Sequence, residues 1–402
     1  MLDRRLRVDS SRPLAVALSG GGDSVALLLA ANAWAQARGR PLTALTVDHR
    51  LQPASRAWTE ACAALAARTG VGFQALAWEG PKPARGLPAA ARLARHRLLA
   101  DAARGVGAGV ILIGHTADDV LEAQAMRAEG STTPAPREWS PSPVWPEGRG
   151  VFLLRPLLAL RRAELRAWLT ARGETWIDDP ANADARFARA RARAALPAGG
   201  ASELQEPRPL ALAEACRIEP GGAIALPREL LRRAPRPEAE RLLAIAAVCA
   251  GGGARLPAAG PRARLAAALC GEGAATSILA GARIEACGEA VRICREAGEA
   301  RRGGLQPLAV SAGDRGVWDG RFEVFAQAAV EVRALGGLAR RLPPDQQRAL
   351  ASLPAAARPA LPAVIDPAGA VSCPLLGASP AQVECLIADR LRAAAGLVAR
   401  EA

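Results

Sequence analysis

Residues 13–37 constrain the fold of this chain more than any other stretch. They begin with an apolar run, residues 14–18, which has the length of a buried strand. Three consecutive glycines follow, and then a segment rich in alanine and leucine that predicts a helix. Glycines between a strand and a helix permit positive φ angles and let a ligand approach the backbone closely. The free N–H groups at the start of the helix would face this turn, so the stretch predicts an anion-binding loop.

The loop lacks the lysine of G-x-x-x-x-G-K-[ST] and the spacing of G-x-G-x-x-G, two better-known phosphate-binding patterns. Asp23 and Ser24 lie where a helix N-cap belongs, so their side chains can complete a phosphate cradle or hold a metal-bound phosphate. A plain glycine turn before a capped helix is the alternative. The loop resembles the PP-loop, S-G-G-x-D-S, of the ATP pyrophosphatases, and this resemblance implies ATP binding and cleavage between the α- and β-phosphates. The candidate ATP-binding residues of the loop are Ser19, Gly20, Gly21, Gly22, Asp23 and Ser24.

Apolar strands alternate with helical segments over the first half of the chain. Strands are predicted at residues 14–18, 42–49, 73–78, 110–115 and 152–158, and helices near residues 25–37, 54–68, 88–104, 117–129 and 161–172. This alternation is typical of an α/β fold, a doubly wound parallel sheet with both faces covered. Ligands bind such sheets beyond the carboxyl ends of the strands. We therefore expect one site to collect the glycine loop and the polar residues at two other strand ends, which are Asp48, His49, His115, Asp118 and Asp119.

The second half of the chain is predicted to form separate domains. Residues 130–150 predict a long loop, and residues 197–209 predict a linker. Beyond the linker, residues 210–270 have a mostly helical pattern, residues 278–325 have short alternating segments typical of β-hairpins, and residues 382–400 predict a terminal helix. We predict three domains: a PP-loop catalytic domain over residues 1–200, a helical and then β-hairpin domain over residues 210–331, and a small mixed α/β domain over residues 332–402.

The formal net charge of the chain is +13, and nearly all of the positive charge is arginine because Lys82 is the only lysine. Such a balance suits a polyanionic partner, although a compositional bias toward arginine and alanine is the alternative. If residues 187–193 form a helix, Arg186, Arg189 and Arg193 share one face. We interpret this face as a phosphate-contacting surface, with a solvated basic face as the alternative.

Several classes of protein are disfavoured by composition. The eight cysteines form no C-x-x-C pair and the chain has three histidines, so we expect reduced thiols and no zinc site. No run approaches eighteen strongly apolar residues, and the N-terminus lacks a secretory pattern. We therefore expect a cytoplasmic protein without a membrane partner.

An ordered series of motifs within residues 13–197 resembles the tRNA(Ile)-lysidine synthases, a PP-loop family of bacteria. The sequence departs from the family pattern at Thr116, Val120, His96 and Ala190, but none of these changes removes the loop or the acidic pair. The C-terminal half is only loosely similar, with residues 318–322 the most family-like string. The motifs are SGGGDS at 19–24, V-D-H at 47–49, A-R-x-x-R at 91–95, H-x-x-D-D-x-x-E at 115–122, M-R at 126–127, R-P-L-L at 155–158, D-P-x-N at 179–182 and R-x-x-x-R at 189–193.

The resemblance implies a two-step reaction and a set of residue roles. ATP would adenylate the wobble cytidine of an isoleucine tRNA with a CAU anticodon, and free L-lysine would then displace AMP to give lysidine, so that the tRNA reads AUA instead of AUG. The implied cofactors are ATP and Mg²⁺, with Asp23 as a candidate metal ligand, and a homodimer is one open option for the assembly. The implied catalytic residues are Asp23, Arg92 and Asp119; ATP would contact the loop, Asp48 and His49; lysine would contact Asp118, Asp119 and Glu122; and tRNA would contact Arg95, Arg127, Arg186, Arg189 and Arg193.

Two of these roles have structural alternatives, and the function has two rivals. Asp118 and Asp119 could simply be an acidic pair that stabilises a helix N-terminus. A PP-loop enzyme of tRNA thiolation would need several cysteines near the ATP site, whereas Cys62 is the only cysteine in the catalytic half. A catalytically inactive RNA-binding homologue would have no need of the intact loop.

Overall fold

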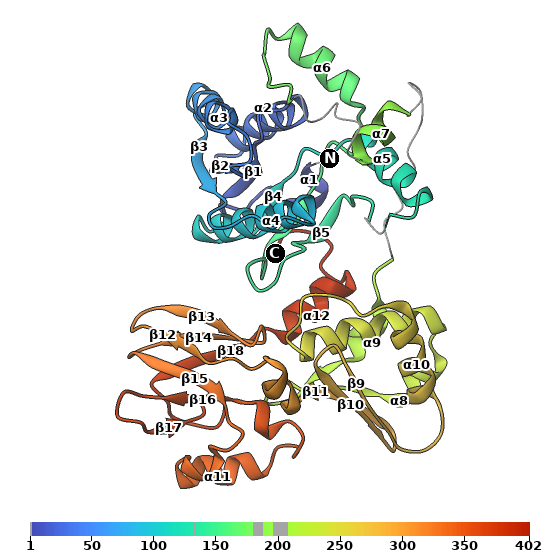
Figure 1. The fold of residues 1–402 in the computed structure, drawn as a ribbon, viewed down its shortest axis with the longest axis vertical. Coiled ribbons are helices and arrows are strands. Elements are labelled where there is room, and N and C mark those ends of the chain that lie inside the picture. Colours follow the sequence, from blue (N-terminus) through green and yellow to red (C-terminus); the bar gives the residue numbers. More distant parts are fainter. Residues whose placement is uncertain (1, 132–133, 180–187, 196–207) are drawn as a thin grey trace. The chain divides into compact units, whose positions relative to one another are not determined.

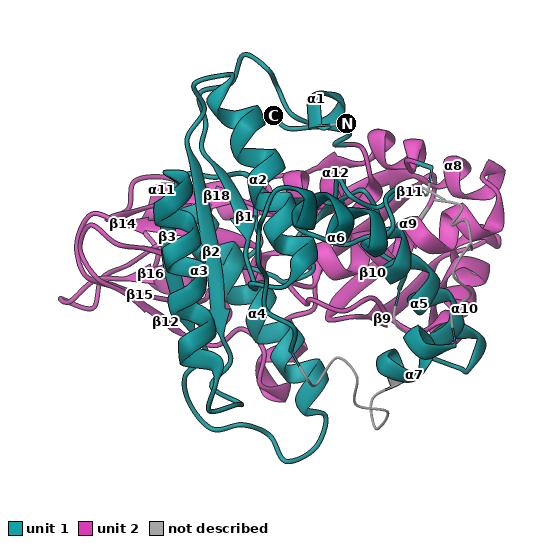
Figure 2. Ribbon diagram, turned by 90° about the horizontal axis from the view of Figure 1, so that it is seen from above, with its two compact units in different colours: residues 1–208, 398–402 teal, residues 209–397 magenta. Residues whose placement is uncertain are grey.

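The computed structural model describes residues 2–131, 134–179, 188–195 and 208–402. The chain divides into two compact units, which are coloured separately in Figure 2. The N-terminal unit comprises Met1–Arg208 together with Val398–Ala402, and the C-terminal unit comprises Pro209–Leu397. Within the described ranges, no helix combines the length and the apolar character needed to cross a bilayer.

A six-stranded sheet of order β3-β2-β1-β4-β6-β5 forms the centre of the N-terminal unit (Figure 1). Its strands are β1 (Leu14–Ala17), β2 (Leu42–Asp48), β3 (Gly72–Ala77), β4 (Val110–Leu112), β5 (Trp139–Pro141) and β6 (Phe152–Leu154). All neighbours pair in parallel except β5, which is antiparallel to β6. The doubly wound parallel sheet predicted from the sequence is therefore confirmed. The edge strand β5 lies within residues 130–150, so the prediction of a long loop over this range was wrong at Trp139–Pro141.

Helices cover both faces of this sheet because successive strand residues point to opposite sides. The helices are α1 (Leu2–Arg5), α2 (Gly22–Gln36), α3 (Ser55–Thr69), α4 (Leu87–Gly105), α5 (Ala117–Ala128), α6 (Arg162–Ala171) and α7 (Ala188–Ala194). On one face, Leu14 and Val16 pack in a core to which α2, α3 and α6 contribute. On the other face, Ala15 packs with Leu99 and Ala103 of α4. The sheet is buried on both sides, as near-continuous apolar strands require.

The strand order places a topological switch point at β1. Strand β1 pairs with β2 on one side and with β4 on the other, and all three run in the same direction. The connections that follow β1 and β4 therefore leave the sheet on opposite sides of a crevice at the carboxyl ends of these strands, which we call the carboxyl edge of the sheet. Such a crevice is where open α/β sheets bind their ligands.

The last residues of the chain pack in the N-terminal unit through a buried ion pair. The two terminal guanidinium nitrogens of Arg40, Nη1 and Nη2, donate to the two carboxylate oxygens of Glu401, and the two side chains are 0% and 2% exposed. Arg40 also donates to the carbonyl of Arg12 at 2.6 Å, and the backbone N–H of Arg7 donates to Glu401 at 3.1 Å. Charges without access to water are stable only when they are paired and hydrogen-bonded, so Arg40 and Glu401 depend on each other.

The C-terminal unit contains three further sheets. The first has the order β7-β8-β11-β10-β9 and packs against α9 and α12 in one core. The others have the orders β12-β15-β16-β17 and β13-β14-β18. The strands are β7 (Arg217–Ile218), β8 (Ile224–Pro227), β9 (Ala275–Leu279), β10 (Ala282–Cys287), β11 (Ala290–Arg295), β12 (Leu308–Val310), β13 (Arg315–Trp318), β14 (Phe322–Ala326), β15 (Val330–Ala334), β16 (Pro362–Ile365), β17 (Val371–Ser372) and β18 (Ala381–Cys385). The helices are α8 (Arg228–Arg233), α9 (Arg236–Ala250), α10 (Ala259–Cys270), α11 (Pro344–Ala351) and α12 (Ile387–Ala395).

The last helix of the C-terminal unit differs from the sequence prediction. The terminal helix predicted at residues 382–400 is wrong at its start, because β18 pairs with β14 and the helix α12 is shorter. The three-domain division stays a prediction; two of the three sheets of the C-terminal unit combine strands from both sides of residue 331. The family-like string at 318–322 forms a hairpin turn, in which Asp319 has a φ of +51° and accepts hydrogen bonds from Arg295 and Arg321.

Candidate active site

The glycine loop lies between β1 and α2 at the carboxyl edge of the sheet. The Ser24 hydroxyl donates to the carbonyl of Gly21 at 2.8 Å and accepts from the backbone N–H of Ser19 at 3.2 Å. These bonds draw the two ends of the loop together. The N-cap of α2 is Gly21, so the prediction that Asp23 and Ser24 lie at the N-cap was wrong. No side chain in the described structure caps the helix, and the N–H groups of its first turn face the loop. An uncapped helix N-terminus inside a glycine loop is a site for an anion.

Two glycines are required by close packing around this loop. Gly20 has a φ of +82°, and a Cβ there would collide with Cδ1 of Ile177. The N–H of Ile177 donates to the carbonyl of Gly20 at 2.9 Å, so a segment more than 150 residues away covers the loop. Gly114, two residues beyond the end of β4, would place a Cβ 3.0 Å from the carbonyl oxygen of Asp23. The loop and the end of β4 therefore meet backbone to backbone.

Asp23 projects from the first turn of α2 and pairs with an arginine from α6. The Nε of Arg162 donates to Oδ2 of Asp23 at 2.9 Å. The other oxygen, Oδ1, is buried and has no hydrogen-bond partner in the described part of the chain. Burial raises the pKa of Asp23, and the Arg162 guanidinium opposes that rise. A buried carboxylate oxygen without a partner is costly unless a ligand or ion satisfies it.

Two buried carboxylates on α5 form the acidic part of the site. Asp119 and Glu122 are 6% and 0% exposed. Oδ2 of Asp119 accepts from the N–H of Thr116 at 2.7 Å, which fixes the carboxylate at the start of the helix. Arg162 lies 3.3 Å from Glu122 and 3.7 Å from Asp119, so it joins this pair to Asp23. Burial alone would raise the pKa of Glu122, but hydrogen bonds from two arginines of α7 outweigh it and lower the pKa.

Those two arginines are Arg189 and Arg193. Arg189 pairs with Asp119 and donates through Nε to Glu122 at 2.7 Å. Arg193 donates through Nε to Glu122 at 2.8 Å. Both were predicted to contact tRNA, and the structure places them on the predicted lysine-binding carboxylates.

Asp118 has different neighbours. Its carboxylate accepts from the guanidinium of Arg161 at 3.0 Å and from the backbone N–H of Arg162 at 2.7 Å. It therefore fixes the start of α6, and through it the position of the Arg162 side chain. The prediction that Asp118 binds lysine stays a prediction.

A group of arginine and histidine side chains lies beside the carboxylates of α5, Asp119 and Glu122. Arg155, only 5% exposed, donates through Nε to Nδ1 of His115 at 2.9 Å. A guanidinium can only donate, so His115 must carry its proton on Nε2. Burial and the nearby arginines hold the pKa of His115 well below its usual value, and they lower the pKa of His96 to about 3. Burial, with Arg92 beside it, lowers the pKa of Arg95 to about 10. Cations that destabilise one another in this way are typical of a site for an anion.

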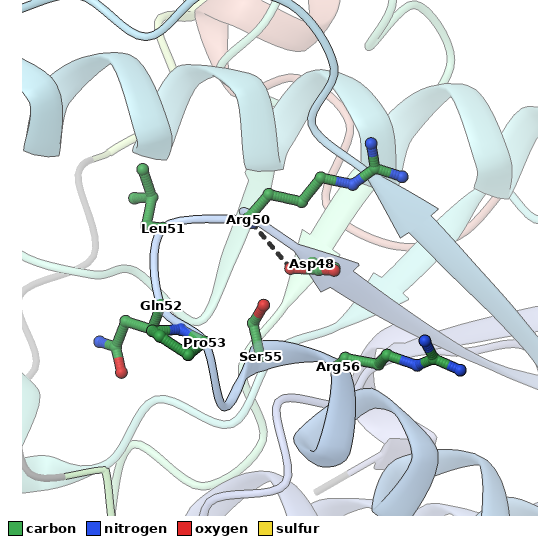
Figure 3. Close-up of a pocket in the computed structure, with 7 residues that line it drawn as sticks. All are labelled: Asp48, Arg50, Leu51, Gln52, Pro53, Ser55 and Arg56. Carbon is green, nitrogen blue, oxygen red and sulfur yellow. Dashed lines mark hydrogen bonds between the residues drawn. The ribbon is translucent and has the colours of Figure 1, made fainter.

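The loop after β2 lines a pocket of about 650 Å³ (Figure 3). Asp48 ends β2 at this pocket, and its Oδ1 accepts from the backbone N–H of Arg50 at 2.7 Å. Ser55 and Arg56 close the pocket at the start of α3 (Figure 3). His49 is half-buried, packs edge-on to Trp78 and has a buried Nδ1 without a partner among the residues described. Asp48 and His49, the two predicted ATP-binding residues outside the glycine loop, thus lie at the carboxyl edge of the sheet, beside the strand that leads into that loop.

The remaining predicted tRNA contacts are dispersed. Arg127 is exposed on α5, and Arg95 is half-buried on α4. Arg186 lies outside the described residues. The residue that sequence reasoning missed is Arg162, which contacts three carboxylates. A usable signal was present, because Arg161 and Arg162 follow a predicted strand of the same parallel sheet.

Comparison with known proteins gives a family for this site. The PP-loop domain family matches residues 2–198. The chain is 49% identical to the tRNA(Ile)-lysidine synthase of Caulobacter vibrioides over 100% of this chain and 97% of that protein. It is 36% identical to the enzyme of the same name from Rhizobium meliloti, over 80% of this chain and 75% of that protein. Among solved structures, the U34-tRNA thiolase NcsA from Methanococcus maripaludis matches 48% of this chain and 68% of that chain with a TM-score of 0.41 and 16% identity.

Proposed function

The chain belongs to the tRNA(Ile)-lysidine synthase family, and from that premise we propose how the residues of its N-terminal unit bind ATP, lysine and tRNA. The protein is an ATP-dependent ligase that forms a C–N bond between L-lysine and a tRNA(Ile). In the first step, O2 of the wobble cytidine attacks the α-phosphorus of ATP and pyrophosphate leaves. In the second, the ε-amine of lysine attacks C2, the C2–O bond breaks and AMP leaves.

We place the diphosphate of ATP in the loop from Ser19 to Ser24. The support is the uncapped N-terminus of α2 and the bonds through which Ser24 closes the loop. The nucleoside would extend toward Asp48 and His49 at the end of the neighbouring strand. This arrangement stabilises the charge that develops on the leaving pyrophosphate through backbone N–H groups already in position.

We propose Mg²⁺ as the second cofactor, held in part by Asp23. Oδ1 of Asp23 is buried and has no protein partner among the described residues, which fits an ion that takes one or two carboxylates along with waters and phosphates. When bound, Mg²⁺ neutralises charge on the diphosphate. Asp23 itself holds its position through Arg162.

The cluster of Arg92, Arg95, Arg155 and His115 is the proposed site for the activated base. Arg92 and Arg95 make no hydrogen bond within the described structure and so are available to the α-phosphate and to the cytidine. His115 would donate from Nε2, because Arg155 occupies Nδ1. These groups stabilise negative charge as the adenylate forms.

Asp119 and Glu122 are the proposed lysine site. They are buried carboxylates at the same edge of the sheet as the loop, and a carboxylate can orient an ammonium group and accept its proton. Asp119 is the proposed base for the ε-amine. The observation that carries the whole proposal is this convergence, at one edge, of an uncapped glycine loop, a cationic group and a buried acidic pair.

The tRNA would extend beyond the anticodon onto the predicted domains 210–331 and 332–402. We retain a homodimer and a cytoplasmic location as proposals, which light scattering after gel filtration and cell fractionation would test. Arg95, Arg127, Arg186, Arg189 and Arg193 remain the proposed tRNA contacts in the N-terminal unit.

The test is incorporation of labelled L-lysine into tRNA transcripts in the presence of ATP. We expect one AMP per lysine with the CAU isoleucine transcript and no incorporation with a methionine transcript that shares the anticodon. ATP-independent RNA binding without incorporation would favour an inactive homologue.

A further inference from the structure

Helix α7 brings two arginines onto the carboxylates that are proposed to bind lysine. Arg189 contacts both Asp119 and Glu122, and Arg193 contacts Glu122. The carboxylate side chains are 7% and 1% exposed, whereas the Arg189 side chain is 45% exposed and that of Arg193 is 33% exposed. The guanidinium groups therefore lie between the acidic pair and solvent.

The charges of this cluster are already balanced without a ligand. Three guanidinium groups contact three carboxylates, and the members are Asp23, Asp119, Glu122, Arg162, Arg189 and Arg193. A lysine side chain that joined this cluster would add a fourth cation to a poorly solvated site. An unpaired charge in such a site costs free energy unless another charge leaves. Binding of lysine at Asp119 and Glu122 therefore requires that an arginine move away.

Arg189 and Arg193 are the arginines best placed to move. Arg162 is 16% exposed and its helix start is fixed by Asp118. The two arginines of α7 are more exposed, and their helix is only seven residues long. Guanidinium groups form bidentate bonds with phosphates as readily as with carboxylates. An RNA backbone bound on this side of the unit would offer them a replacement partner.

We propose, on the basis of the proposed lysine site, that Arg189 and Arg193 occupy the ammonium position as internal substitutes for lysine and are released by tRNA phosphates. Lysine then binds with high affinity only after tRNA is bound. Because coupling between two sites is reciprocal, lysine also strengthens the binding of tRNA. The same two arginines thus serve the acidic pair in the free protein and the RNA in the complex.

The experiment measures binding of radiolabelled L-lysine to the full chain by equilibrium dialysis, without ATP, so that no turnover occurs. For the unaltered protein, we expect the CAU isoleucine transcript to lower the Kd for lysine by about 5- to 150-fold, the usual range of coupling between sites. The variant with Arg189→Gln and Arg193→Gln should bind lysine without tRNA about as tightly as the unaltered protein does with it. Addition of tRNA should then change its Kd by less than about twofold.

Arg191→Gln is the matched control. Arg191 lies between the two arginines on the same helix and is exposed, so its exchange removes one charge from α7 without removing a contact to Asp119 or Glu122. This variant should keep the coupling of the unaltered protein. An equal gain in lysine affinity with Arg191→Gln would mean that only the net charge of the helix matters, which would overturn the proposal.

Glu122→Gln distinguishes a failure of the proposed lysine site from a failure of the arginine exchange. If it leaves lysine binding unchanged in both states, the proposed lysine site is wrong and this inference fails with it. If it abolishes binding while the double variant gains no affinity without tRNA, the lysine site stands and only the exchange is refuted. A lysine Kd of the unaltered protein that does not respond to tRNA refutes the exchange without any variant.

Discussion

Replacing Glu401 with glutamine should destabilise the N-terminal unit, although the residue lies at the opposite end of the sequence from the sheet. The exchange leaves the Arg40 guanidinium buried with no counter-charge, since its side chain is 0% exposed. Breaking a buried ion pair by removing one partner costs about 3–5 kcal/mol. Arg40 keeps its bond to the carbonyl of Arg12, and a glutamine oxygen can still accept one hydrogen bond, so we expect about 3 kcal/mol.

Thermal unfolding of the full chain measures this cost. For a unit of this size, 1 kcal/mol shifts Tm by about 2–4 °C, so Glu401→Gln should lower the Tm of the N-terminal transition by roughly 6–12 °C. That transition is identified as the one that ATP raises, because a ligand stabilises the unit that binds it.

The control is Glu60→Gln, which breaks an exposed pair with Arg56 whose side chains are 65% and 89% exposed. Exposed pairs of this spacing contribute about 0.3–0.5 kcal/mol, so the control should shift Tm by no more than about 2 °C. Equal shifts for the two variants would refute the inference that the end of the chain is part of the core of this unit.

Three further predictions concern the site. Arg162→Met removes the cation that opposes the burial-driven rise in the pKa of Asp23. The acid limb of the pH profile of kcat/KM for AMP formation should therefore move to higher pH. An unmoved limb would mean that Asp23 does not titrate in the reaction. Gly20→Ala should raise the KM for ATP, whereas Gly39→Ala, which has a similar positive φ but no atom within 4 Å of the added methyl, should not; matching effects would assign the change to backbone strain alone. The pKa of Glu122 is lowered in the folded state, so its ion pairs stabilise the fold at pH values above the unfolded-state pKa of 4.5, and this contribution is lost as the pH falls through the folded-state pKa. Glu122→Gln should therefore flatten the decline of the unfolding free energy at acid pH. Urea unfolding at several pH values measures this decline.

The sheet of the N-terminal unit could be predicted because its information is local. Apolar runs such as residues 14–18 and 110–115 are long enough to identify buried strands, and the helical segments between them dictate parallel pairing. Parallel pairing in turn brings the ends of β1, β2 and β4 to one edge. Neither β5 (WSP) nor β18 (AQVEC) is an apolar run, and both strands contain partly exposed polar residues, which is why β5 was missed and β18 was taken for helix.

The partners of the charged residues could not be predicted in the same way. Asp119 and Arg189 are 70 residues apart, and Asp23 and Arg162 are 139 apart, so no periodicity links them. Adjacent aspartates also differ: Asp119 faces the arginines of α7, and Asp118 holds the start of α6. Asp118 and Asp119 are adjacent on α5, so their side chains point in different directions. Only the packing of α5 against its neighbours determines which arginines each of them contacts.

The most direct test of the proposed loop compares AMP formation and tRNA binding in the unaltered protein and in Asp23→Asn. The variant keeps the shape of the side chain and removes the charge beside the proposed diphosphate site. We predict that AMP formation from ATP, measured with the CAU isoleucine transcript and lysine, is lost while the Kd for that transcript is unchanged. Undiminished AMP formation in the variant, or loss of tRNA binding along with it, would contradict the assignment of this loop to ATP.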